Sequence, residues 1–67
     1  MNKVVGDVVE NIIGRHLSFA YPLIKENGLM SRVIWLDGQC ITGDLLHKPN
    51  RINLTVVNDI ITDADVG

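Results

Sequence analysis

The chain has 67 residues, which allows one small domain with a single core and excludes a multi-domain enzyme. Hydrophobic residues make up 46% and charged residues 21%, so the chain is neither a disordered tail nor a coiled coil. Eight acidic residues against six basic ones give a net charge of −2, which argues against binding to nucleic acid.

The first segment, residues 1–13, carries apolar side chains at helical spacing, and this spacing predicts a short helix. Gly6 and the β-branched valines lower its intrinsic helix propensity. The apolar stripe, which includes Val5 and Val9, has two interpretations. Either it covers the core of its own chain, or it pairs with a second copy and makes the protein a homo-oligomer.

A second helix is predicted over residues 17–27, where apolar residues recur at spacings of three and four and Gly28 provides a stop. Pro22 conflicts with a regular helix, because an interior proline removes one hydrogen bond and clashes with the preceding turn. Either the helix begins near Ser18 as its N-cap, or it is kinked at Pro22.

Two segments are predicted to form the main strands. Residues 30–36 are β-branched and aromatic, and their near-continuous apolar run predicts burial on both faces, as in a parallel pair. Residues 51–57 alternate apolar and polar side chains, which is typical of a half-buried strand. A turn at residues 58–59 then leads to a short strand at residues 60–62 and an acidic tail.

Residues 37–50 have neither a helical nor an alternating period, and they are predicted to form one long loop. Such loops are uncommon in compact domains and are usually functional or disordered, so this one is the first candidate for function. The resulting fold class is α+β, with one helix packed on a small sheet.

The chemistry of this loop favours binding over catalysis. Cys40, Asp44 and His47 lie in it, but nothing in their spacing enforces a catalytic geometry, and Cys40 is expected to be buried or half-buried. The apolar pair Leu45 and Leu46 either anchors the loop or contacts a partner. No enzyme activity is therefore expected.

Cys40 is the only cysteine, so no internal disulfide can form. Secreted domains of this size often need one, which favours a cytoplasmic location, or an extracellular or periplasmic one if a leader was removed. Cys40, His16 and His47 match no zinc spacing, so neither a metal nor a cofactor is expected. No apolar run approaches the roughly 20 residues that span a bilayer, and no signal peptide is evident.

The order of several short motifs resembles the potato-inhibitor-I group of serine protease inhibitors, and more closely its bacterial and fungal relatives, the I78 family. The matching residues, in chain order, are Ile13-Gly14-Arg15, Ala20, Ile24, Gly28-Leu29, Arg32-Val33-Ile34, Gly38-Gln39, Ile41-Thr42, Asp44, Pro49-Asn50-Arg51-Ile52-Asn53-Leu54 and Val66-Gly67. The resemblance covers about three quarters of the chain. It makes residues 14–67 an inhibitor-like core, with residues 1–13 as an N-terminal extension.

The resemblance implies two main parallel strands joined by an exposed inhibitory loop at residues 38–50, which enters a protease as a substrate does. The reactive-loop residues would be Thr42, Gly43, Asp44, Leu45, Leu46 and His47. Arg51 matches an arginine that supports the loop from below, and Asn53 matches an asparagine of the I78 relatives. The expected partner is a subtilisin-like or chymotrypsin-like protease.

The loop departs from the family pattern, because it is two residues longer between the threonine and the proline. Matching from its N-terminal side places Gly43 at the primary specificity position, and matching from its C-terminal side places Leu45 there. Leu45 is preferred, since glycine has no side chain to fill a pocket. The alternative function is a small interaction module on the same scaffold, directed at a non-protease partner or at a second copy.

Overall fold

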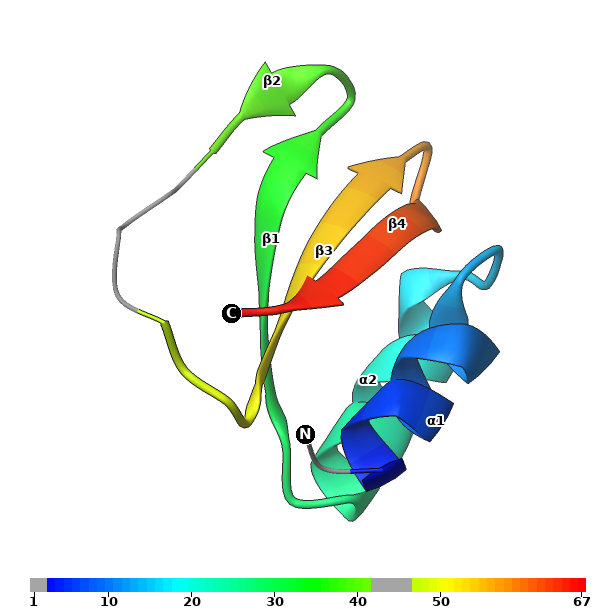
Figure 1. Ribbon diagram of the computed structural model, residues 1–67. Coiled ribbons are helices and arrows are strands. Elements are labelled where there is room, and N and C mark those ends of the chain that lie inside the picture. Colours follow the sequence, from blue (N-terminus) through cyan, green and yellow to red (C-terminus); the bar gives the residue numbers. More distant parts are fainter. Residues whose placement is uncertain (1–2, 42–46) are drawn as a thin grey trace.

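The computed structural model describes residues 3–41 and 47–67. In chain order its elements are α1 (Lys3–Ile12), α2 (Leu17–Glu26), β1 (Met30–Leu36), β2 (Gln39–Cys40), β3 (Arg51–Val57) and β4 (Ile60–Val66). The strands form one mixed sheet in the order β2-β1-β3-β4, and both helices lie on the same side of it (Figure 1). The α+β class is confirmed. The expectation of a single helix on the sheet is wrong, because α1 packs there beside α2.

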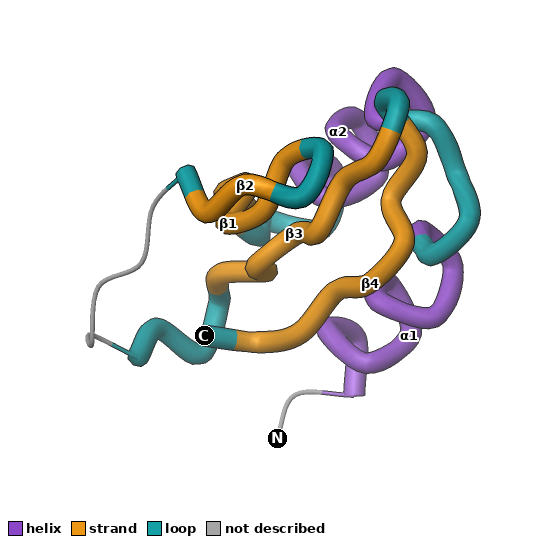
Figure 2. The backbone as a smooth tube through the Cα atoms, turned by 90° about the horizontal axis from the view of Figure 1, so that it is seen from above, coloured by secondary structure: helices purple, strands orange, loops and turns teal. Residues whose placement is uncertain are grey.

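The central strands β1 and β3 run parallel, from Met30 opposite Arg51 to Leu36 opposite Val56, with an irregularity between Val33 and Trp35. The predicted parallel pair is therefore confirmed. Because parallel neighbours cannot be joined by a tight turn, the connection from β1 to β3 must travel back along the sheet. Figure 2 shows the sheet between the helices and the segment that leads into β3, so this segment lies away from the helices.

The core lies between the helices and the inner face of the sheet. Its members are Val5, Val8, Ile12, Ala20, Ile24, Ile52, Leu54, Val56, Ile61 and Ala64. The predicted alternation in β3 is confirmed, because its apolar side chains at positions 52, 54 and 56 are all buried. Residues 1–13, expected to be an extension, supply three of the core side chains, so α1 is part of the packed domain.

β1 is less buried than predicted. Trp35 is 44% exposed and Leu36 is 37% exposed, so burial on both faces is wrong for this strand. Among the described residues, both helices lie on the other face of the sheet, and the short strand β2 is the neighbour of β1 on its outer edge.

β4 is longer than predicted. It pairs antiparallel with β3 as far as Val66, so the prediction of a tail from residue 63 is wrong. Exposed Asp63 and Asp65 alternate with buried Ala64, and this period of two is that of a strand with one buried face. The short side chain of Ala64 made the pattern hard to detect.

α2 begins earlier than Ser18. The N-cap is His16, whose Nδ1 accepts a hydrogen bond of 3.1 Å from the main-chain nitrogen of Ser18. The helix continues through Pro22 to Glu26, so the proline is interior to it. The predicted stop at Gly28 is confirmed, since this residue has a φ of +71°, which favours glycine.

The His16 cap gives a first prediction. His16→Ala removes the acceptor for the Ser18 N–H, and we expect the free energy of unfolding to fall by about 0.5–1 kcal/mol. His16→Asn provides another cap acceptor and is expected to retain most of the stability. Urea denaturation followed by circular dichroism measures both. An unchanged free energy of unfolding in His16→Ala would show that the cap contributes nothing.

Candidate functional site

The N-terminal stem of the connection is a β-hairpin. Asp37 and Gly38 form its turn with φ angles of +50° and +84°, and β2 then pairs with the end of β1. The main-chain nitrogen of Ile41 continues the pairing with a 2.9 Å bond to the oxygen of Ile34. The prediction of an irregular loop from residue 37 is therefore wrong on this side, where hydrogen bonds hold the chain as far as Ile41.

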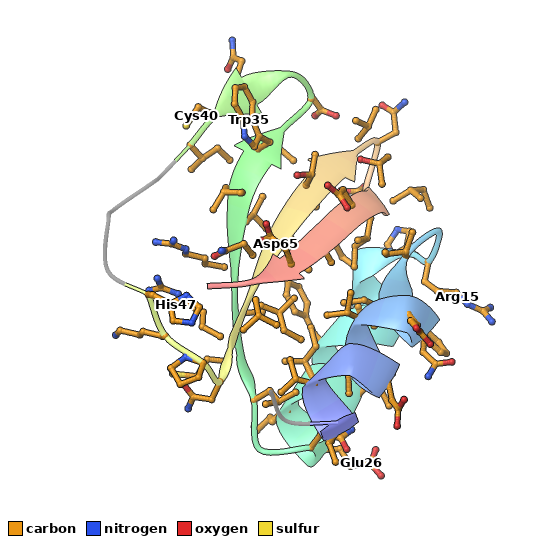
Figure 3. All side chains as sticks on the ribbon, in the orientation of Figure 1. Arg15, Glu26, Trp35, Cys40, His47 and Asp65 are labelled. Carbon is orange, nitrogen blue, oxygen red and sulfur yellow. The ribbon has the colours of Figure 1, made fainter. Side chains whose placement is uncertain are left out.

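Cys40 lies in this hairpin and is exposed, so the expectation of a buried or half-buried thiol is wrong. It is opposite Trp35 in the strand register, and Figure 3 shows the two side chains together at the same end of the sheet. β2 is the edge strand of the sheet, so no further strand of the described part of the chain pairs with its outer side.

The C-terminal stem is held by main-chain hydrogen bonds to its neighbours. The nitrogen of Lys48 donates to the oxygen of Gly67 over 3.3 Å, and the nitrogen of Arg51 donates to the oxygen of Lys48 over 3.1 Å. The oxygen of Asn50 accepts a 2.8 Å bond from the nitrogen of Met30. The chain is therefore fixed to β1 and to the end of β4 just before it enters β3. His47, at the start of this stem, is exposed.

Arg51 is the buried polar residue of the described chain, with 8% of its surface exposed. Its Nε donates to the main-chain oxygen of Gly67 over 3.0 Å, and its Nη2 donates to the same oxygen over 2.6 Å. The main-chain oxygen of Arg51 in turn accepts a 2.9 Å bond from the nitrogen of Gly67. The hydrogen bonds between Arg51 and Gly67 therefore attach the start of β3 to the residue that follows β4.

Asn53 lies one step further along β3. Its Oδ1 accepts a 2.6 Å hydrogen bond from Nε of Arg32, its register partner on β1. A Cβ on Gly67 would lie 2.6 Å from Asn53 Nδ2 and 3.9 Å from His47 Nδ1. The absence of a side chain at Gly67 therefore lets the main chain settle against Asn53. We call this group of residues the loop foot. It consists of Arg32, Asn53, Gly67, Arg51 and residues 47–48.

Sequence reasoning identified Arg51 and Asn53 but missed the roles of Arg32 and Gly67. A signal for Arg32 was present. Aligning the two predicted parallel strands from their first residues, 30 with 51, pairs Arg32 with Asn53 directly. The partnership of Arg51 with Gly67 joins residues 16 positions apart, and it becomes visible only once β4 is known to reach Val66.

Five of the predicted reactive-loop residues lie outside the described residues, namely Thr42, Gly43, Asp44, Leu45 and Leu46. The preference for Leu45 over Gly43 as the specificity residue therefore stays a prediction. Among the residues that the structure does describe, no three His, Cys, Asp or Glu side chains are grouped so as to hold a metal ion. In the same residues, neither helix has the length and apolar character needed to cross a membrane.

Comparisons of this chain with protein-family models, with curated proteins and with solved structures find no match.

Proposed function

We propose that this protein is a substrate-like inhibitor of a serine protease, with residues 42–46 as the contact segment. The observation that carries the proposal is the buried guanidinium of Arg51, which is bonded to the main chain of Gly67 at the point where the connection rejoins the sheet. An arginine is costly to bury unless its donors are used. Its presence beneath the C-terminal stem fits a residue that supports an exposed loop.

Both stems support this function. The N-terminal stem is hydrogen-bonded to β1 through Ile41, and the C-terminal stem is hydrogen-bonded to Gly67 through Lys48. β1 and β3 are themselves neighbours in the same sheet. A segment anchored at both ends to a rigid sheet loses less conformational entropy on binding than a free peptide does, and this is a source of affinity. The same anchoring holds the two new ends together after a cut and favours religation.

Leu45 is the residue we assign to the specificity pocket of the protease. An apolar side chain of this size suits the apolar pocket of a subtilisin-like or chymotrypsin-like enzyme, whereas Gly43 offers nothing to bury. The proposal gives no catalytic residue to this chain, and it requires no cofactor and no metal. As part of the same proposal we place the protein in the cytoplasm. This location is argued from the single cysteine, which cannot form the internal disulfide that secreted domains of this size often need.

The test is a titration of subtilisin, chymotrypsin and elastase with the full chain, followed by intact-mass analysis. We expect stoichiometric inhibition of at least one protease and one slow cut between Thr42 and Leu46. Rapid degradation, or no inhibition with the chain left whole, would contradict the proposal.

The reactive bond is tested separately with two variants. Leu45→Gly should raise the inhibition constant by about 10²-fold or more, because the specificity pocket is left unfilled. Leu46→Gly, at the neighbouring position, should cause a smaller change. Inhibition constants measured for both variants against the same protease provide the check. If Leu45→Gly inhibits as well as the unaltered chain, Leu45 is the wrong choice and Gly43 takes its place.

The second candidate function is an interaction module directed at a non-protease partner or at a second copy. The observation that favours it is the exposure of large apolar side chains in the β1–β2 hairpin, where Trp35 is 44% exposed and Ile41 is 54% exposed. Exposed aromatic residues of this kind are enriched at protein interfaces. Under this function Trp35→Ser abolishes partner binding and Leu45→Gly does not, which is the reverse of the result expected for an inhibitor.

A further inference from the structure

The face of the sheet that is turned away from the helices carries an exposed tryptophan. Leu54 and Val56 are buried on the helix side of β3, so Thr55 between them points to the other face. Trp35 is the register partner of Thr55, and opposed residues of neighbouring strands lie on the same face. Val57, two residues after Thr55, is also on this face, and it is 41% exposed. We call Trp35, Thr55 and Val57 the outer patch.

Two carboxylates border the outer patch. Asp63 lies on β4 in the same row of the register as Trp35, and Asp37 follows Trp35 by two residues at the hairpin turn. Neighbouring strands are about 4.8 Å apart and successive residues about 3.3 Å, so both aspartates are within about 10 Å of Trp35. Both are exposed, and their Oδ1 atoms accept from main-chain nitrogens, Asp37 from Asn58 over 2.8 Å and Asp63 from Ala64 over 2.9 Å. Such donors are uncharged, so the negative charge remains.

The six lysine and arginine residues of the chain are placed on other parts of the molecule. Lys3 and Lys25 are on the helices, Arg32, Lys48 and Arg51 belong to the loop foot, and the guanidinium of Arg15 lies 4.8 Å from the ring centre of Phe19 on α2. Figure 3 shows Arg15 beside the helices, far from Trp35. Arg32 precedes Trp35 by three residues on β1, and its Nε is bonded to Asn53. The outer patch is therefore an apolar surface with a negative border.

From this arrangement we infer that the outer patch binds a protein segment that carries a lysine or arginine beside an apolar side chain. Trp35 is 44% exposed, and tryptophan is the aromatic residue that attracts a cation best and is enriched at interfaces. A second copy of this chain is disfavoured as the partner, because it would bring a further net charge of −2 to a surface that is already acidic. The inference rests on the second candidate function, whose partner it specifies, and does not depend on protease inhibition.

The experiment titrates the isotopically labelled full chain with three synthetic peptides and follows the titration by NMR. The first peptide alternates arginine and leucine, the second has glutamate in place of arginine, and the third has serine in place of leucine. Trp35 is the only tryptophan, so its indole N–H signal reports directly on the outer patch. At about 20 mM ionic strength we expect the first peptide to shift this signal and the amide signals of Thr55 and Val57 in a saturable way. The other two peptides should bind at least about 10-fold more weakly.

A double variant tests the border charges. Asp37→Asn with Asp63→Asn removes both charges, while each amide oxygen can still accept its main-chain hydrogen bond, and asparagine tolerates the positive φ of residue 37. We expect it to weaken binding of the first peptide about 3- to 10-fold at about 20 mM ionic strength and less than about 2-fold at roughly 0.5 M salt. The control, Asp7→Asn with Glu26→Gln, makes the same change of net charge on the helices and should weaken binding less than about 2-fold.

A second pair of variants tests the aromatic contact. Trp35→Ser should weaken binding at least about 10-fold, whereas Phe19→Ser, at a similarly exposed aromatic residue on α2, should leave it unchanged. Absence of shifts with the first peptide would overturn the inference. Equal effects of the two charge variants, or an effect that salt does not change, would also overturn it and leave the outer patch as an apolar interface. A dimer in sedimentation experiments that Trp35→Ser breaks would overturn it in favour of a second copy. Each of these outcomes leaves protease inhibition to its own titration.

Discussion

Arg51→Ala should lower the free energy of unfolding by about 2–4 kcal/mol and, under the proposed function, greatly weaken inhibition. The substitution removes both guanidinium hydrogen bonds to the buried oxygen of Gly67, which then keeps the 3.3 Å bond from the Lys48 nitrogen. Losing hydrogen bonds from a charged group costs about 1.5–3 kcal/mol, and the lost packing of the arginine stem adds to this. A domain of 67 residues has a total stability of about 3–10 kcal/mol, so the loss is a large fraction of it.

The effect on inhibition has a separate cause. Without the contact between Arg51 and Gly67, the C-terminal stem loses the support beneath it, and the contact segment has more conformational freedom to lose on binding. We expect the inhibition constant to rise by about 10²-fold or more and the slow cut to become fast. Kinetic titration with intact-mass analysis over time measures both.

The control for Arg51→Ala is Leu54→Ala. Leu54 is on the same strand, fully buried, and faces the helices instead of the loop foot. Its truncation costs about 2–5 kcal/mol by creating a core cavity. Measured at a temperature where circular dichroism shows both variants folded, Leu54→Ala should still inhibit. If the two variants weaken inhibition by the same factor, Arg51 acts through overall stability and does not support the loop specifically.

The parts of the fold that the sequence predicted well are those with a strong local pattern. β3 is predicted with its observed bounds, because every second side chain from Ile52 to Val56 is a large apolar residue buried in the core. In β4 one of the buried positions of the same pattern is Ala64. Its side chain is small, so alanine there is only a weak signal of a buried face. The hairpin turn at Asp37-Gly38 was read only as the end of a strand, although this dipeptide also favours the tight turn that starts β2.

The loop foot was predictable only in part, for a different reason. Arg51 and Asn53 were found through a resemblance, and the structure places both at the C-terminal stem. Their partners come from β1 and from the end of β4, and no local pattern specifies contacts between segments so far apart. For the N-cap of α2 the sequence offered Ser18, of the commoner N-cap residue type, and also His16, for which a capping or a solvent role was expected; the structure shows that His16 is the cap.

Val5→Asp is expected to unfold the protein at 25 °C, while Val4→Asp leaves it folded. Val5 is 1% exposed and packs in the core, whereas the adjacent Val4 is 43% exposed. Burying an ionised carboxylate among apolar side chains costs more than a domain of this size has available. At Val4 the new carboxylate lies in the first turn of α1, which holds no acidic residue, and there the helix dipole favours it by about 0.3–1 kcal/mol. Far-UV circular dichroism and the dispersion of amide proton resonances measure the outcome.

This pair of variants also bears on the two interpretations of the valine stripe. From the sequence alone, a charge at Val5 that abolished function would have indicated a dimer interface. In the structure Val5, Val8 and Ile12 lie in the core of their own chain, so the same loss would reflect unfolding. A dimer that buries α1 must therefore use its exposed side, where Val4 lies. Val4→Asp tests this directly, since it should break such a dimer in sedimentation experiments while the monomer stays folded. If Val5→Asp remained folded, that result would contradict the packing of α1 against β4. The interpretation of the valine stripe as a contact with a second copy would then stand again.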